Sequence, residues 1–165
     1  MPDKIIGLPA HPLVVHAAVV LVPLAVIAFA VLCWKTEWRK SYLLPVTLLS
    51  IAGGVAALLA KQSGEPLQHS IRTAARAAGQ TGALGDHPEQ GDTAFVWAFL
   101  FMCAVVAYWA VLRWGSRWSV PSWAPKAGYY AVLVPGAIAL VTMMIAGHSG
   151  AALVWKDVGT FKVGA

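Results

Sequence analysis

Residues 5–34 read IIGLPAHPLVVHAAVVLVPLAVIAFAVLCW and contain no charged side chain. A helix of roughly 20 mostly apolar residues spans the hydrocarbon core of a bilayer, so this stretch is long enough to cross it once. Three more uncharged stretches follow at 41–60, 93–112 and 127–155. The pattern predicts an all-α integral membrane protein, a four-helix bundle whose spans cover about 13–34, 43–60, 92–114 and 129–148. We expect residues 1–165 to form a single transmembrane domain.

The composition supports a membrane protein and argues against several other classes. The chain is 59% apolar and 12% charged, whereas a soluble domain has about 25% charged residues. The net charge is +5, but the basic residues form no long run, so we expect the lipid bilayer and no nucleic acid as a partner. Cys33 and Cys103 form no Cys-x-x-Cys motif, which argues against a zinc knuckle or covalently attached haem. The sequence has no Ser–His–Asp order and no phosphate-binding loop, so we assign no catalytic residue.

The distribution of basic residues predicts the orientation in the membrane. The segments 35–40 and 113–126 share one side, and the only acid there is Glu37; their basic residues are Lys35, Arg39, Lys40, Arg113, Arg117 and Lys126. Because Lys and Arg collect in cytoplasmic loops, both termini are predicted on the extracytoplasmic side. Ala28 and Ala30 imitate the cleavage site of a signal peptide. However, the positive cluster follows the apolar run instead of preceding it, which favours an uncleaved helix.

The segment 61–92 is the only long connection between spans. Ser63 and Glu65 precede Pro66 as they do at helix starts, and Arg72 and Arg76 lie opposite a weakly apolar side formed by Leu67, Ile71, Ala74, Ala75 and Ala78. This pattern predicts a short amphipathic helix that lies on the membrane surface between spans 2 and 3. No internal repeat is evident along the chain.

All five histidines, at positions 11, 16, 69, 87 and 148, fall in the outer third of this topology. Ionisable side chains in membrane helices normally face the bundle interior or a water-filled cavity. We therefore expect His16 and His148 to point inward at similar depth, with His87 at the mouth of the third span. His11 lies five residues before His16 and cannot share its face of one helix, so we place it at the start of the span.

Several short motifs resemble a known family when they are taken in order. They are Gly7 to His16 (GLPAHPLVVH) with Leu21 to Leu24, Ser63 to Leu67 (SGEPL), His87 with Gly91 and Asp92, and Gly147 to Ala151 (GHSGA) with Leu153 to Trp155. They resemble the bacterial membrane proteins of domain-of-unknown-function family 2231 over nearly the whole chain. The resemblance implies a four-helix domain in the bacterial inner membrane and no established activity.

Two functional hypotheses assign the histidines to a cofactor. In the first, His16 and His148 are the axial ligands of a b-type haem, with His87 as a substitute for either, and the protein transfers electrons to a redox partner. Small residues beside His148 would leave room for the macrocycle. In the second, His16, His87 and His148 bind copper or zinc, together with Asp86, Glu89 or Asp92.

The third hypothesis involves no cofactor. His16, His87 and His148 would form a hydrogen-bonded polar cluster that joins helix ends, with Asp92 or a loop carbonyl as partner. The protein would then be a structural or accessory subunit of a larger membrane complex. The sequence leaves these three hypotheses open.

Overall fold

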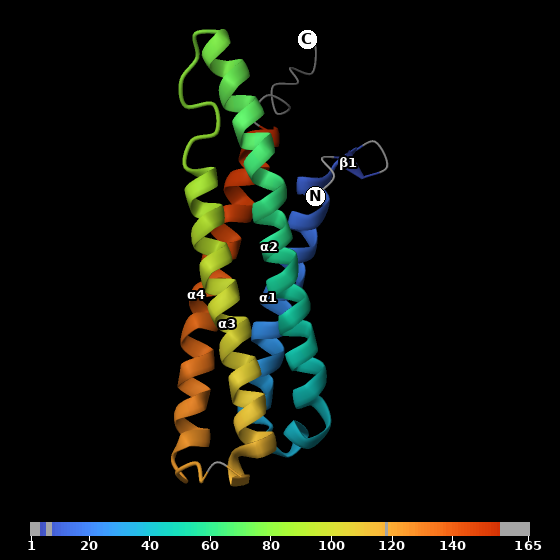
Figure 1. The fold of residues 1–165 in the computed structure, drawn as a ribbon, viewed down its shortest axis with the longest axis vertical. Helices are drawn as coiled ribbons and strands as arrows, with labels where there is room; N and C mark the ends of the chain where they lie inside the picture. Colours follow the sequence, from blue (N-terminus) through green and yellow to red (C-terminus); the bar gives the residue numbers. More distant parts are fainter. Residues whose placement is uncertain (1–3, 6–7, 118, 156–165) are drawn as a thin grey trace, which may run out of the picture.

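Four long helices form the bundle in the computed structural model, which describes residues 4–5, 8–117 and 119–155 (Figure 1). They are α1 (Ala10–Trp34), α2 (Arg39–Ala77), α3 (His87–Trp114) and α4 (Ala124–Trp155). The short elements are the two-stranded pair β1 (Lys4–Ile5) and β2 (Leu8–Pro9), and the 3₁₀ turns η1 (Thr36–Trp38) and η2 (Gly115–Arg117). Helix α1 packs against α2 and α4, and α3 packs against the same two helices. The prediction of an all-α four-helix bundle is confirmed.

Small residues let the helices approach closely along the core. A Cβ atom added to Gly54 of α2 would lie 2.5 Å from the Met102 sulfur on α3, and one added to Gly136 of α4 would lie 3.0 Å from the Phe101 ring. Outside this core the helices expose large apolar side chains, among them Leu24, Ile27, Leu48, Leu100 and Val141. All four helices are long and apolar enough to cross a membrane. The exposed apolar surface is therefore the surface that lipid would cover.

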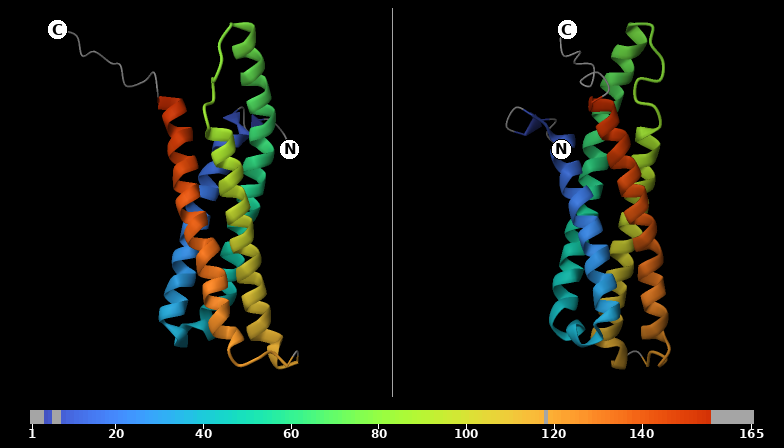
Figure 2. Two further views of the ribbon diagram at one scale, coloured as in Figure 1. Left: turned by 90° about the vertical axis from the view of Figure 1, so that its left-hand side faces the viewer. Right: turned by 180° about the vertical axis from the view of Figure 1, so that it is seen from behind.

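The segment after span 2 differs from its prediction. Helix α2 continues without a break through Pro66 to Ala77, and in Figures 1 and 2 its green end stands beyond the ends of the other three helices. Its 39 residues correspond to about 58 Å at 1.5 Å per residue, well beyond the roughly 30 Å core of a bilayer. No short surface helix is present between spans 2 and 3, so this part of the prediction is wrong. We call residues 61–77 the α2 extension.

Local interactions explain why the helix continues. The Ser63 hydroxyl donates to the Ala60 carbonyl of the preceding turn (3.0 Å), so it does not cap a new helix. Lys61 lies 3.5 Å from Glu65 one turn later and also pairs with Asp92 at the start of α3. The α2 extension ends at Ala77, and Gly79 follows it with a positive φ of 67°, which suits glycine.

Arg39 links three helices at the end of the bundle that carries η1 and η2. Its Nε donates to the Leu32 carbonyl of α1 (2.9 Å), and its Nη1 donates to the Tyr129 hydroxyl of α4. The guanidinium carbon also lies 4.3 Å from the centre of the Tyr129 ring. Because this arginine at the start of α2 binds both α1 and α4, it fixes the helix ends opposite the histidines. We call this end of the bundle the loop end. The opposite end, where α1 and α3 begin, is called the histidine end.

The close approach at Gly136 makes a direct test of the packing. Replacing Gly136 with Leu forces atoms into the Phe101 ring and should destabilise the protein by about 1–3 kcal/mol. Gly91→Leu is the matched control, because a Cβ at Gly91 meets no atom within 4 Å. Thermal unfolding in detergent should show a lower melting temperature for Gly136→Leu only. Equal melting temperatures for the two variants would contradict the helix contacts described here.

Candidate functional site

His11 is held at the histidine end by the neighbouring helix α2. Its half-buried imidazole has Nδ1 2.9 Å from the Ala60 carbonyl oxygen and 3.3 Å from the Ser63 hydroxyl. A carbonyl oxygen can only accept a hydrogen bond, so Nδ1 is the nitrogen that carries the proton. In the neutral imidazole, Nε2 therefore keeps a free lone pair.

His87 makes the equivalent contact with helix α4. Its Nδ1 lies 2.9 Å from the Ser149 hydroxyl, which itself donates to the Ala146 carbonyl (3.1 Å). Because the serine proton is directed to Ala146, the hydrogen bond between His87 and Ser149 is donated by Nδ1. Among the described residues, neither Nε2 of His11 nor Nε2 of His87 has a hydrogen-bond partner.

A glycine beneath each ring allows these contacts. A Cβ atom added to Gly64 would lie 2.9 Å from Cε1 of His11, and one added to Gly150 would lie 2.9 Å from Cε1 of His87. Each imidazole thus lies against the backbone of the neighbouring helix. Any larger residue at these two positions would displace the ring.

The two clusters reveal an internal repeat that was not evident when the sequence was read alone. His11-Pro12 and His87-Pro88 both open a helix, and Ala-x-x-Ser-Gly occurs at 60–64 and at 146–150. Each buried residue of α3 lies 76 positions after a buried residue of α1; the pairs are Ala18/Ala94, Val22/Ala98, Ala25/Phe101, Phe29/Val105 and Leu32/Tyr108. Each buried residue of α4 likewise lies 86 positions after a buried residue of α2; the pairs are Val46/Val132, Ser50/Gly136, Gly53/Ala139, Ala57/Met143 and Ala60/Ala146. The hairpins α1–α2 and α3–α4 are therefore structural repeats.

The repeat places His11 and His87 on diagonally opposite helices at the same end. In the packing order α1, α2, α3, α4, the repeat relates the two hairpins by an approximate two-fold rotation about the bundle. Beneath the two imidazoles lies a layer of small buried residues, one from each helix: Ala18, Ala60, Ala94 and Ala146.

His16 and His148 do not point inward, and that expectation is wrong. Both side chains are exposed, and Nδ1 of His16 lies 2.5 Å from the Pro12 carbonyl of its own helix. His16 precedes buried Ala18 by two residues and His148 follows buried Ala146 by two. Two residues of α-helix rotate a side chain by about 200°, so both histidines lie opposite the core.

The three histidines proposed as metal ligands are not brought together. Within residues 4–5, 8–117 and 119–155, no group of three His, Cys, Asp or Glu side chains is placed to hold a metal ion. Two of the candidate carboxylates are engaged elsewhere: Asp92 pairs with Lys61, and Glu89 lies 3.7 Å from Arg72. Of the predicted site residues His16, His87 and His148, only His87 contacts a neighbouring helix through its imidazole in the described part of the chain.

Gln90 adds a polar group that the sequence reading missed. Its Oε1 atom is buried and has no hydrogen-bond partner among the described residues. Gln90 lies one turn after His87 and one turn before Ala94, which places it on the core-facing side of α3. The equivalent position in the first repeat is Val14, so the surroundings of the two imidazoles differ in polarity at this position.

Comparison with known proteins agrees with the architecture. The family described as "Predicted membrane protein (DUF2231)" matches residues 7–162. No curated protein and no solved structure matches the sequence. With four membrane-length helices and a match over almost its full length, the chain belongs to the DUF2231 family of predicted membrane proteins.

Proposed function

We propose that this membrane protein binds a b-type haem between His11 and His87 and transfers electrons at that end of the bundle. The observation that carries the proposal is the state of the two imidazoles. Each has Nδ1 committed to a neighbouring helix while Nε2 remains unpaired. Histidines that ligate metals almost always donate their other ring N–H in this way, which fixes the tautomer and the ring orientation.

The number of ligands favours haem iron over a bare metal ion. Haem supplies four nitrogen ligands itself and needs two axial ligands from the protein, which this pair of histidines would provide. A bare zinc ion usually takes three or four protein ligands. No third His, Cys, Asp or Glu joins the pair in the described part of the chain. Bis-imidazole haem coordination is therefore the better fit.

The surroundings of the pair would accommodate a flat macrocycle only if the helices separate slightly. The alanine layer formed by Ala18, Ala60, Ala94 and Ala146 presents no bulky side chain beneath the imidazoles. Gly64 and Gly150 carry no side chain, so each imidazole lies directly against the backbone of the neighbouring helix. His11 and His87 would hold a haem between α1 and α3 through Nε2 and would keep their Nδ1 hydrogen bonds to α2 and α4.

We further propose that the histidine end faces the extracytoplasmic side, where a redox partner would dock. The loop end carries the basic residues Lys35, Arg39, Lys40, Arg113, Arg117 and Lys126. It also exposes Trp34, Trp38, Tyr42, Trp123 and Tyr130. Basic residues favour the cytoplasmic side and exposed aromatic rings favour the membrane interface, so both support this orientation.

A second candidate function, an accessory subunit without a cofactor, is favoured by one observation. Each imidazole already joins two helices through its Nδ1 hydrogen bond. Such a bond contributes to stability whether or not Nε2 has a ligand, and a typical hydrogen bond is worth about 0.5–1.5 kcal/mol. In this case the histidines would only clamp the two hairpins.

Substitutions of the histidines distinguish ligand from clamp. Protein purified from haem-replete cells should show a Soret band that sharpens on reduction. His11→Asn and His87→Asn should abolish it, because Asn can still donate to the Ala60 carbonyl or to the Ser149 hydroxyl but lacks the Nε2 ligand. The matched controls His16→Asn and His148→Asn change exposed side chains and should keep the band.

Two outcomes would reject haem binding at this pair. A colourless wild-type protein would favour the clamp, in which case His11→Ala should lower the melting temperature more than His11→Asn. A band that survives in both His11→Asn and His87→Asn would show that the ligands lie elsewhere.

The glycines beneath the rings offer an independent test. Gly64→Ala and Gly150→Ala place a methyl group 2.9 Å from the imidazole Cε1 and should displace it, which weakens haem retention and shifts the Soret band. Gly147→Ala is the control, since its Cβ meets Val19 at an ordinary 3.6 Å. Equal spectra for all three variants would argue against rings that lie on these helices.

The orientation can be measured with single cysteines. In a Cys33→Ser, Cys103→Ser background, a membrane-impermeant maleimide should label Thr81→Cys in intact cells but not Ser122→Cys. Both positions are exposed, at opposite ends of the bundle. Labelling of Ser122→Cys alone would reverse the proposed topology.

A further inference from the structure

The α2 extension carries basic side chains above the membrane part of the bundle. Between residues 66 and 85 the charged side chains are Arg72 and Arg76, and there is no acid. Arg72 lies twelve residues after buried Ala60, or about 18 Å along the helix. A headgroup layer extends only about 5–8 Å beyond the hydrocarbon core. A membrane boundary near Ala60 would place these arginines in water rather than among lipid headgroups.

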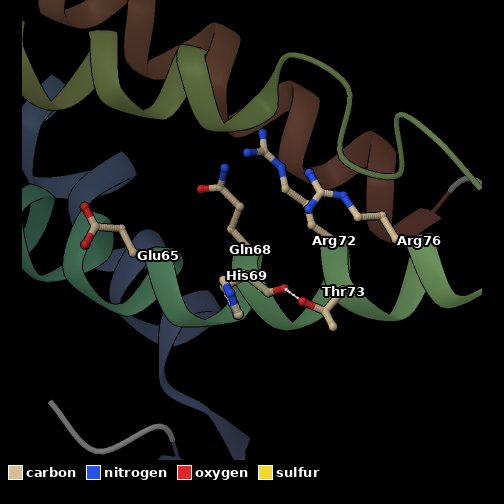
Figure 3. A pocket seen from close by; sticks show the side chains of 6 residues that line it. All are labelled: Glu65, Gln68, His69, Arg72, Thr73 and Arg76. Carbon is tan, nitrogen blue, oxygen red and sulfur yellow. Dashed lines mark hydrogen bonds between the residues drawn. The ribbon is translucent and has the colours of Figure 1, made fainter.

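A pocket of about 290 Å³ lies along this part of the helix. Its lining consists of Glu65, Gln68, His69, Arg72, Thr73 and Arg76 (Figure 3). Gln68, Arg72 and Arg76 are spaced four residues apart, and their side chains point into the space between the α2 extension and the returning segment 78–86 (Figure 3). The polar ends of three side chains from successive turns therefore gather on one side of the helix.

The two arginines differ in how far they are already paired. Arg72 lies 3.7 Å from Glu89, and with the Gln68 amide oxygen facing it, Arg72 donates two hydrogen bonds of 2.9 Å to that oxygen. These contacts orient the Arg72 guanidinium. Arg76 has no ion pair with any described residue. Its guanidinium is therefore available to an added anion.

We infer that this pocket binds a small soluble oxyanion, a phosphate or carboxylate group, between Arg72 and Arg76. A guanidinium presents a planar fork of N–H donors that matches such groups through paired hydrogen bonds. The volume is at the low end for ligand pockets, which suits a small solute. The ligand must compete with Glu89 for Arg72, while Glu65 also lies at the pocket. This inference is independent of haem binding.

Titration of the full chain in a non-ionic detergent with inorganic phosphate tests the inference. We expect saturable binding that weakens at high salt. Arg76→Gln should weaken it by at least about 10-fold, because a charge-assisted hydrogen bond is lost. Arg76→Lys should weaken it less, since the charge remains without the fork. Arg113→Gln, an exposed arginine at the loop end, is the control and should bind as the wild type does.

A second measurement separates a soluble ligand from a lipid headgroup. Phosphate binding should be the same in nanodiscs made of zwitterionic or of anionic phospholipid. Competition by the anionic phospholipid would overturn the assignment to a soluble ligand. Absence of saturable binding, or equal affinity of Arg76→Gln and wild type with unchanged melting temperatures, would overturn the site itself.

Discussion

The need to pair polar groups where water is scarce governs the histidine end of this bundle. The imidazole N–H of His11 meets the Ala60 carbonyl, and that of His87 meets Ser149, whose own proton goes to Ala146. Both contacts cross from the first turn of one helix to the next helix along the chain, so each closes a hairpin at the end opposite its loop. Since Gly64 and Gly150 make room for the rings, the same small set of residues fixes the hairpins and leaves two Nε2 atoms unpaired.

The architecture could be predicted from the uncharged stretches because membrane spans need only length and apolarity. The end of the second span could not be predicted in the same way. Ser63, Glu65 and Pro66 have the residue types of a helix start, but Ser63 bonds back to Ala60 and the helix continues. The fixed φ of proline is compatible with a helix, so α2 passes through Pro66 although this residue type suggested the start of a new helix. The result is one continuous helix whose end stands beyond the ends of the other three.

The inward histidines could not be identified from depth alone. Helices α1, α3 and α4 are apolar on nearly every side, so hydrophobicity does not mark the side that faces the core. The five-residue spacing correctly placed His11 and His16 on different sides of the helix. It could not show which of the two sides faces the core, because nothing in the sequence of α1 marks that side. The usable signal was the repetition of His-Pro and Ala-x-x-Ser-Gly at equal positions in two hairpins. Gln90 gave no such signal, because its counterpart is Val14 and its buried oxygen is visible only in the folded protein.

The most direct test of the account is the protonation state of the five imidazoles in haem-free protein. Nitrogen-15 NMR of histidine-labelled protein, with His11→Asn and His87→Asn used for assignment, reports which ring nitrogen carries the proton. At a pH where the imidazoles are neutral, we expect His11 and His87 to carry the proton at Nδ1 and to exchange it slowly, whereas the exposed His148 should exchange freely. Protonation of both His11 and His87 at Nε2, or equal exchange for all five rings, would contradict the paired site on which the proposed function rests.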